Sequence, residues 1–167
     1  MIVADATTLA ALALIGKADV LVKLVGKVKI SDQTERELKE ILGARGSGHP
    51  FPDEVVEVVT VDVSYATLSL SESETLQLGR QIKAKVLITD DAVLRREARK
   101  DRMVPLGTLG ILYAARRKAL IPNLEEVFTR LREVGYGIAP ACERMLLTRT
   151  SSKGKRPDDT TIFDFRC

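Results

Sequence analysis

Short apolar runs alternate with segments of helical periodicity along the chain. The first run, Ile2 and Val3, leads into Asp5, and further runs typical of strands lie at residues 27–30, 55–63, 85–89 and 103–106. The run at 85–89, KVLIT, is almost wholly apolar, as expected of a strand that is buried on both faces. Apolar residues at helical spacing predict helices at 9–15, 19–25, 34–44, 71–83, 92–100, 109–118, 124–134 and 141–147.

This alternation predicts an α/β fold of three layers, in which a central, mostly parallel sheet has helices on both faces. The chain shows no internal repeat and no linker, so we expect one domain over residues 1–147 and a polar, flexible tail over 148–167. With 45% hydrophobic residues, a chain of 167 residues can form a core without disulfides or a structural metal.

The cellular location can be inferred from membrane-spanning segments and signal peptides, and the sequence shows neither pattern. No segment reaches the roughly 20 uninterrupted apolar residues that cross a bilayer, and the start of the chain lacks the basic region of a signal peptide. We therefore expect a cytoplasmic protein. The two cysteines, Cys142 and Cys167, show no spacing typical of a disulfide framework or a zinc site, and we expect both to be free thiols.

Acidic residues follow two of the predicted strands directly. Asp5 ends the first strand, and Asp90 and Asp91 follow the strand at 85–89. Ligands of parallel α/β sheets bind at the carboxyl ends of the strands, so we expect these acids to lie on one edge. Helix capping is the alternative for each of them, because Asp5 and Asp90 precede helices and Asp91 falls in a first helical turn.

Two glutamates complete the candidate set. Glu37 and Glu74 lie at the margins of apolar helical stripes, from which they can point along the edge where helix meets sheet. The alternatives are a solvent-facing position for Glu37 and a capping-box role for Glu74. Glu40 and Glu72 are the competing residues if the register is shifted.

Converging carboxylates repel one another, and a hard divalent cation relieves this repulsion. Oxygen ligands suit Mg²⁺ or Mn²⁺, and such ions activate water for phosphodiester hydrolysis. The single histidine, His49, lies in a Gly-Pro loop, which excludes histidine acid–base ribonucleases and Ser-His-Asp hydrolases. No glycine-rich loop follows the first strand, which excludes a P-loop or Rossmann nucleotide site.

The net charge is +3, and the basic residues are clustered. Arg95, Arg96, Arg99, Lys100 and Arg102 form the largest group. Such a run is either a solvated helix face or a surface for an anionic substrate such as RNA.

The acids and their flanking segments resemble the PIN-domain ribonucleases, particularly the VapC-like group of prokaryotic toxin–antitoxin modules. The segment IVADATTLAALALIGKADVL resembles that family's opening, in which an aspartate ends the first strand and a Ser or Thr follows two residues later. ISDQTERELKEIL resembles its second helix, and SESETLQLGRQIKAKVLITDD resembles the helix and strand that carry the third acid and a Thr-x-Asp ending. PLGTLGILYAARRKALIPNLEEVFTRLREVGYGI resembles the C-terminal part of one poorly characterised PIN subgroup, and the whole resemblance covers residues 1–147.

The resemblance implies a PIN-like fold and a Mg²⁺- or Mn²⁺-dependent endoribonuclease. It places four acids in the catalytic and metal site and adds Asp90 to the metal ligands; the four are Asp5, Glu37, Glu74 and Asp91. Thr7 and Thr89 would support these ligands, and Arg95 and Arg99 would contact RNA phosphates. One departure is the third acid, which is more often aspartate in the toxin branch and is Glu74 here.

Three roles are consistent with this reading. The first is the toxin of a toxin–antitoxin module, which implies a homodimer and a cognate antitoxin protein as partner. The second is a housekeeping nuclease for RNA processing. The third is a non-catalytic module that binds RNA or protein on a PIN fold.

Overall fold

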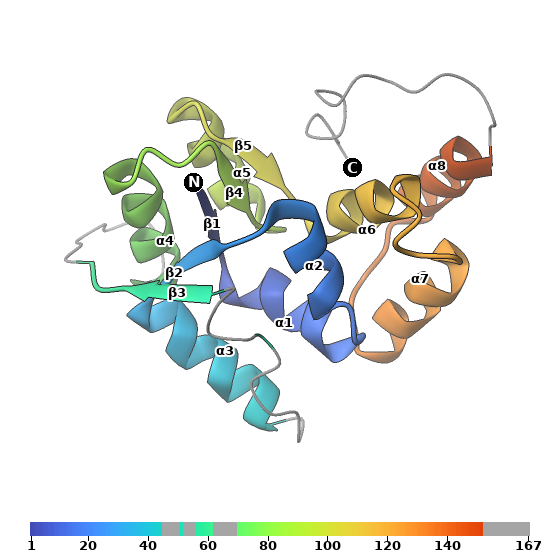
Figure 1. Cartoon of the computed structure of the whole chain (residues 1–167), viewed down its shortest axis with the longest axis horizontal. Coiled ribbons are helices and arrows are strands. Elements are labelled where there is room, and N and C mark those ends of the chain that lie inside the picture. The colour runs from blue at the N-terminus through green and yellow to red at the C-terminus, as the bar shows by residue number, and fades with distance from the viewer. Residues whose placement is uncertain (45–50, 52–55, 62–69, 152–167) are drawn as a thin grey trace.

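The computed structural model describes residues 1–44, 51, 56–61 and 70–151, and within these residues five strands form one all-parallel sheet (Figure 1). The strands lie in the order β3-β2-β1-β4-β5. Their bounds are β1 Ile2–Ala4, β2 Val28–Ser31, β3 Val56–Val59, β4 Val86–Ile88 and β5 Val104–Leu106. The first strand is therefore central, and Val3 pairs with Lys29 on one side and Leu87 on the other.

Alternate side chains of the central strands enter two separate cores. Val3 and Leu87 pack with α4 (Leu70–Gln81) and α5 (Ala92–Lys100) on one face of the sheet. Ala4 and Ile88 belong to the larger core on the other face, to which the remaining described helices contribute side chains. Those helices are α1 Ala6–Leu14, α2 Ala18–Val25, α3 Asp32–Ala44, α6 Thr108–Arg117, α7 Leu124–Glu133 and α8 Pro140–Ser151. The three-layer α/β/α prediction is confirmed.

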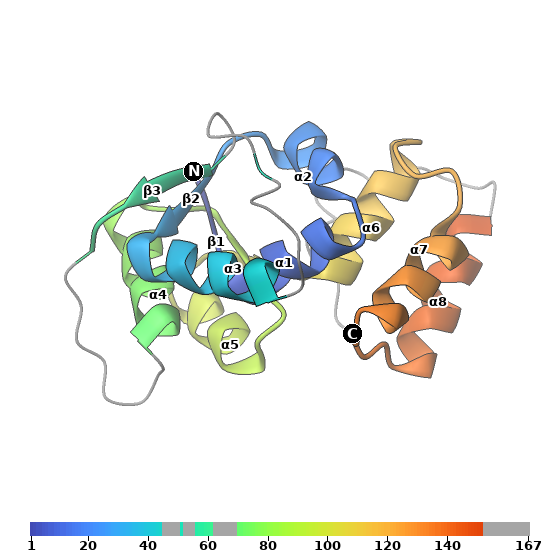
Figure 2. The ribbon, with the colours of Figure 1, turned by 90° about the horizontal axis from the view of Figure 1, so that it is seen from below.

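The last three helices form one end of the molecule. α6, α7 and α8 pack on one another, away from the β3 edge of the sheet (Figures 1 and 2). Leu124, Phe128 and Leu131 of α7 are buried there, and α8 contributes Leu146. These helices extend the core laterally and do not add a layer to the sheet.

Element boundaries differ modestly from those predicted. Of the strand expected at 55–63, the structure describes residues 56–61, and the strand among them is Val56–Val59. The helix expected at 141–147 is α8, which runs from Pro140 to Ser151. The first four residues of the predicted tail therefore belong to a helix, while residues 152–167 and the loop at 46–50 lie outside the described residues.

Two further expectations concern membrane segments and cysteines. In the part of the chain that the structure describes, every helix is too short or too polar to cross a bilayer. Cys142 is disulfide-bonded, so the expectation of a free thiol is wrong for this residue. Cys167 lies outside the described residues.

Candidate active site

The candidate site lies where the parallel strands end. Backbone hydrogen bonds continue the sheet one residue beyond β1 and β4. The Asp5 N–H donates to the Ile88 carbonyl at 3.0 Å, and the Thr89 N–H donates to the Leu106 carbonyl at 2.9 Å. The residues that follow these strands are therefore held on one edge, as the sequence predicts for Asp5, Asp90 and Asp91.

Asp5 is both a helix cap and a buried acid. Its Oδ1 accepts hydrogen bonds from the Thr8 N–H at 2.8 Å and the Thr7 hydroxyl at 3.2 Å, which caps α1. Its Oδ2 is buried and accepts no hydrogen bond from the described residues. Capping, the alternative reading of the sequence, therefore occupies only one of the two oxygens.

Desolvation dominates the electrostatics of Asp5. The residue is 5% exposed, and this burial raises its pKa from 3.8 to about 6. The neighbouring Thr89 hydroxyl opposes the rise of the pKa but forms no hydrogen bond of ordinary geometry with Oδ2, while the charge of Asp90 adds to the rise. A buried acid with a raised pKa and an open acceptor is typical of a functional site.

The two adjacent aspartates have different structural roles. Asp91 caps α5, since its Oδ1 accepts from the Leu94 N–H at 2.7 Å. Asp90 instead reaches α6, where its Oδ1 accepts from the Thr108 N–H at 3.0 Å and its Oδ2 accepts from the Thr108 hydroxyl. The Thr8 hydroxyl also donates to Oδ2 at 3.4 Å. The capping role that the sequence offers for Asp90 in α5 is therefore wrong, because Asp91 holds that position.

Gly107 makes room for Asp90 at the start of α6. A Cβ atom at this position would lie 2.4 Å from Oδ1 of Asp90 and 2.9 Å from Nη1 of Arg95. Sequence reasoning assigned no role to Gly107, Thr108 or Thr8. The available signal was the Gly-Thr-Leu-Gly turn at 107–110, which stands in the segment resembling a PIN subgroup.

The structure also describes both glutamates of the candidate set. Glu74 is buried, and its Oε2 accepts from the Gln33 N–H in the first turn of α3 at 3.4 Å. This bond holds Glu74 at the start of the helix that follows β2, on the edge where Asp5 lies. Glu37 is half-buried on the same helix, whereas Glu40 is exposed. The side chain of Glu72 lies outside the described residues.

The supporting and basic residues also have defined positions. The Thr89 hydroxyl accepts from the Asp91 N–H at 3.1 Å, so it holds the backbone of that acid. Nη1 of Arg95 donates to the Thr89 carbonyl at 3.1 Å, and Arg99 is exposed one turn further along α5. Burial lowers the pKa of the Arg95 guanidinium, which the charge of Asp90 partly offsets.

The fit to a metal ion rests on Asp5. Among the described residues, no group of three or more His, Cys, Asp or Glu side chains lies close enough together to hold an ion. Sharing of one ion by all five predicted carboxylates therefore stays a prediction. Mg²⁺ needs fewer protein ligands, because it is commonly held by one or two carboxylates, with water and substrate phosphate completing its shell. The open Oδ2 of Asp5 fits that arrangement.

Comparison with known proteins gives one match. A family model described as a PIN domain matches residues 1–152, which is nearly the whole chain. No curated protein and no solved structure matches significantly. PIN domains are generally nucleases that act on RNA with divalent metal ions such as Mg²⁺. The match agrees with the parallel sheet and its acidic edge, and the chain belongs to the PIN-domain family.

Proposed function

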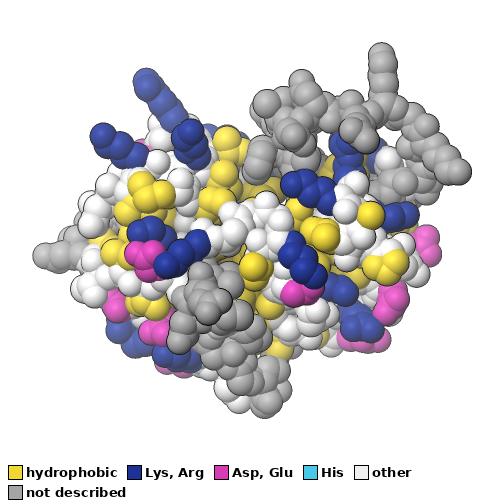
Figure 3. Space-filling view, in the orientation of Figure 1, with side chains coloured by type: hydrophobic (Ala, Val, Ile, Leu, Met, Phe, Trp, Pro, Cys, Tyr) yellow, Lys and Arg dark blue, Asp and Glu magenta, His cyan; other side chains and the backbone are white. Residues whose placement is uncertain are grey.

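We propose that the chain is a metal-dependent endoribonuclease that hydrolyses RNA phosphodiester bonds at the carboxyl edge of its sheet. The observation that carries the proposal is the buried Asp5, with one oxygen held by Thr7 and Thr8 and the other open. An oxygen of this kind is a ligand for a hard cation. Lys and Arg side chains are spread over the face shown in Figure 3, which favours a polyanionic substrate.

In this proposal Asp5 holds Mg²⁺ or Mn²⁺, and three further acids, Glu37, Glu74 and Asp91, complete the catalytic site. When bound there, such an ion would activate water for attack and would offset the negative charge that develops on the phosphate. The raised pKa of Asp5 falls when a cation replaces its proton, so the carboxylate is ionised when the site is loaded.

The chain's own hydrogen bonds orient these acids. Thr7 fixes Asp5, and Thr89 fixes the backbone of Asp91. We expected Asp90 among the metal ligands, but both of its oxygens accept hydrogen bonds. This pattern favours a positioning role, in which Asp90 keeps β4, α1 and α6 in register around the site.

We further propose that the nuclease is the toxin of a toxin–antitoxin module, which acts as a homodimer and is inhibited by a cognate antitoxin. The support is the resemblance of its segments to the VapC-like group. Induced expression is expected to arrest bacterial growth, and co-expression of the protein encoded next to it is expected to relieve the arrest. Normal growth on induction, with RNA precursors accumulating when the gene is deleted, favours the housekeeping alternative.

A cleavage assay tests the enzymatic proposal. The purified full chain is incubated with end-labelled single-stranded RNA and Mn²⁺, with and without chelator. We expect cleavage that both the chelator and Asp5→Asn abolish. Asp19→Asn is the matched control, because Asp19 is an exposed acid of α2 that pairs with Lys23. Cleavage that survives both the chelator and Asp5→Asn contradicts the proposal, and RNA binding without metal-dependent cleavage indicates a non-catalytic module.

A further inference from the structure

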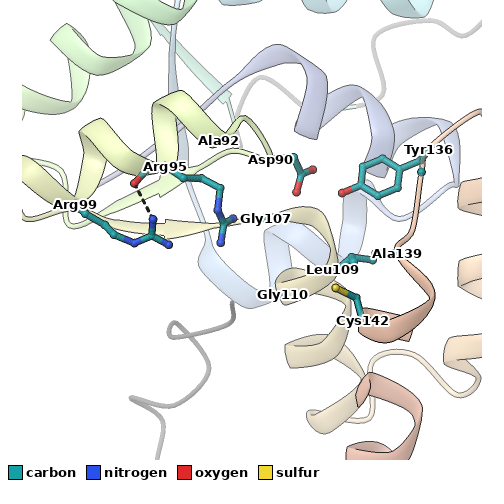
Figure 4. A pocket seen from close by; sticks show the side chains of 11 residues that line it. Asp90, Ala92, Arg95, Arg99, Gly107, Leu109, Gly110, Tyr136, Ala139 and Cys142 are labelled. Atoms are coloured by element: carbon teal, nitrogen blue, oxygen red, sulfur yellow. Dashed lines mark hydrogen bonds between the residues drawn. The ribbon is translucent and has the colours of Figure 1, made fainter. Parts of the chain in front are cut away.

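A cavity of about 520 Å³ opens directly beside Asp90. It lies between α5, the start of α6 and the segment that joins α7 to α8 (Figure 4). This volume is in the range of small-molecule sites, roughly 300–1,000 Å³. The cavity therefore has room for a group of the size of one nucleotide next to the acidic edge.

One wall of the cavity is cationic. Arg95 and Arg99, one turn apart on α5, both line it. Nη1 of Arg95 donates to the Thr89 carbonyl at 3.1 Å, and Nη1 of Arg99 donates to the Arg95 carbonyl at 3.4 Å (Figure 4). Backbone carbonyls thus hold both guanidinium groups at the cavity. Asp90 is the acidic side chain of the lining, and its oxygens already accept from Thr108.

The remaining cations of α5 are engaged differently. Arg96 and Lys100 pair with Glu97 at 3.1 and 2.9 Å. Arg99 has no carboxylate within ion-pair distance among the described residues, and it is exposed to solvent at the cavity wall. The charge of Arg99 is therefore available to an anionic ligand, whereas Glu97 offsets the charges of Arg96 and Lys100.

The opposite wall is aromatic and apolar. Tyr136, Leu109 and Ala139 line it, and the Tyr136 hydroxyl points toward Asp90 (Figure 4). Burial and the nearby charge of Asp90 both raise the pKa of this phenol, so it stays protonated and the ring stays neutral. A ring and an aliphatic side chain facing two guanidinium groups match the two parts of a nucleotide, a flat base and an anionic phosphate.

We propose that this cavity binds one unpaired nucleotide of the RNA, adjacent to the bond that is cut. The phosphate lies against Arg95 and Arg99, and the base lies against Tyr136 and Leu109. This inference rests on the proposed nuclease function and narrows its substrate. A base in a duplex is stacked and paired, so it enters the cavity only when the strand is single.

The test measures binding separately from cleavage. A fluorescently labelled single-stranded oligoribonucleotide is titrated with the full chain in chelator, so that no RNA is cut. Loss of a charge-assisted hydrogen bond is worth about 1.5–3 kcal/mol, so Arg99→Ala is expected to weaken binding at least about tenfold. Arg96→Ala is the matched control, since it removes the same charge from the same helix outside the cavity. It is expected to change binding no more than about threefold.

A second pair of variants tests the base-binding wall. Tyr136→Phe keeps the ring, whereas Tyr136→Leu removes it. Stacking of one base is worth about 1–3 kcal/mol, so Tyr136→Leu is expected to weaken binding about tenfold while Tyr136→Phe stays within about threefold. Tyr136→Leu is also expected to reduce the preference for single-stranded over duplex RNA. Melting curves establish whether each variant is folded. If Tyr136→Leu is not folded, the comparison of Arg99→Ala with Arg96→Ala tests the nucleotide site.

The outcomes separate this proposal from the nuclease proposal. Equal loss of binding in Arg96→Ala and Arg99→Ala overturns the nucleotide cavity, as does equal affinity of the unaltered chain for single-stranded and duplex RNA. Neither result would contradict the proposal that the chain cleaves RNA with a metal ion. Conversely, binding that depends on Arg99 but not on Arg96, without any cleavage in Mn²⁺, supports the cavity and overturns the nuclease.

Discussion

Replacing Asp5 by asparagine removes a buried negative charge and keeps a side chain of nearly the same shape. Asparagine is as good an N-cap as aspartate, so the bond from the Thr8 N–H to the side chain of residue 5 is expected to remain. The principal change is the loss of an ionisable group whose pKa is about 6 in the folded protein. The substitution therefore converts the raised pKa into a measurable difference in stability.

The size of the expected change in the free energy of unfolding follows from the shift of the Asp5 pKa. Burial raises it from 3.8 to about 6, and each unit corresponds to about 1.36 kcal/mol, so the ionised carboxylate lowers the free energy of unfolding by about 3 kcal/mol. The folded state binds this proton more tightly than the unfolded chain does. Its contribution to stability therefore falls as the pH rises from about 3.8 to 6 and stays low above that range.

Urea unfolding in chelator, followed by circular dichroism at several pH values, measures this effect. The stability difference between Asp5→Asn and the unaltered chain is expected to grow by about 2–2.5 kcal/mol from pH 4 to pH 7, in favour of the variant, because part of the full effect already develops below pH 4. Asp19→Asn is expected to change with the opposite sign, because Lys23 lowers the pKa of Asp19. A difference for Asp5→Asn that is constant across this range would show that folding does not raise the pKa of Asp5.

Two further substitutions test the geometry around the site. Gly107→Ala places a methyl group 2.4 Å from Oδ1 of Asp90; we expect cleavage to fall at least about tenfold and stability by about 1–3 kcal/mol. Gly43→Ala is the control for urea unfolding and cleavage, because its added Cβ meets nothing within 4 Å. We expect it to raise the free energy of unfolding by up to about 1 kcal/mol. An equal loss of cleavage in both variants would contradict a steric clash with Asp90 as the cause. Glu74→Gln is expected to lower the single-turnover cleavage rate at least about tenfold. Glu40→Gln is the control, because Glu40 is exposed on α3, and we expect it to leave the rate unchanged. An unaltered rate in Glu74→Gln would exclude Glu74 from the site.

The layers of the fold could be predicted because they depend on local patterns. Within the run at 85–89, the residues Val86–Ile88 are buried on both faces as β4 of a parallel sheet. Helical segments between the strands lead to parallel crossovers. The packing of α7 and α8 against α6 could not be predicted. It depends on which apolar faces find each other at the end of the sheet, and helical periodicity alone does not specify a partner.

The acidic edge was predictable for the same reason, but the roles of its members were not. Asp90 and Asp91 both precede α5, so the sequence alone leaves open which of them caps it. Asp90 does not cap α5, because the N–H and the hydroxyl of Thr108, at the start of α6, both donate to its carboxylate. Asp91 therefore takes the capping position. Thr108 is 18 residues away in the chain, and only the pairing of β4 with β5 brings it near.

The open oxygen of Asp5 depends on tertiary structure as well. The sequence offers capping and ligand binding as alternatives. In the structure one oxygen caps α1, and the other is buried and accepts no hydrogen bond from the described residues. Burial of that oxygen requires the strands on both sides of β1 and the helices that cover them. No local pattern reports how many donors reach a buried atom, so this part of the site could only be found in the structure.

In the proposed mechanism Asp5 holds the divalent cation on which cleavage depends, and the protons released on metal binding report on this role. Calorimetric titration with Mn²⁺ in buffers of different ionisation enthalpy gives the protons released per ion bound. With a pKa of about 6, we expect about 0.9 proton from Asp5 at pH 5 and less than about 0.1 at pH 7.5. Asp5→Asn is expected to lose both the release and most of the affinity. Unchanged Mn²⁺ affinity in Asp5→Asn, or binding at pH 5 without proton release, would contradict the account.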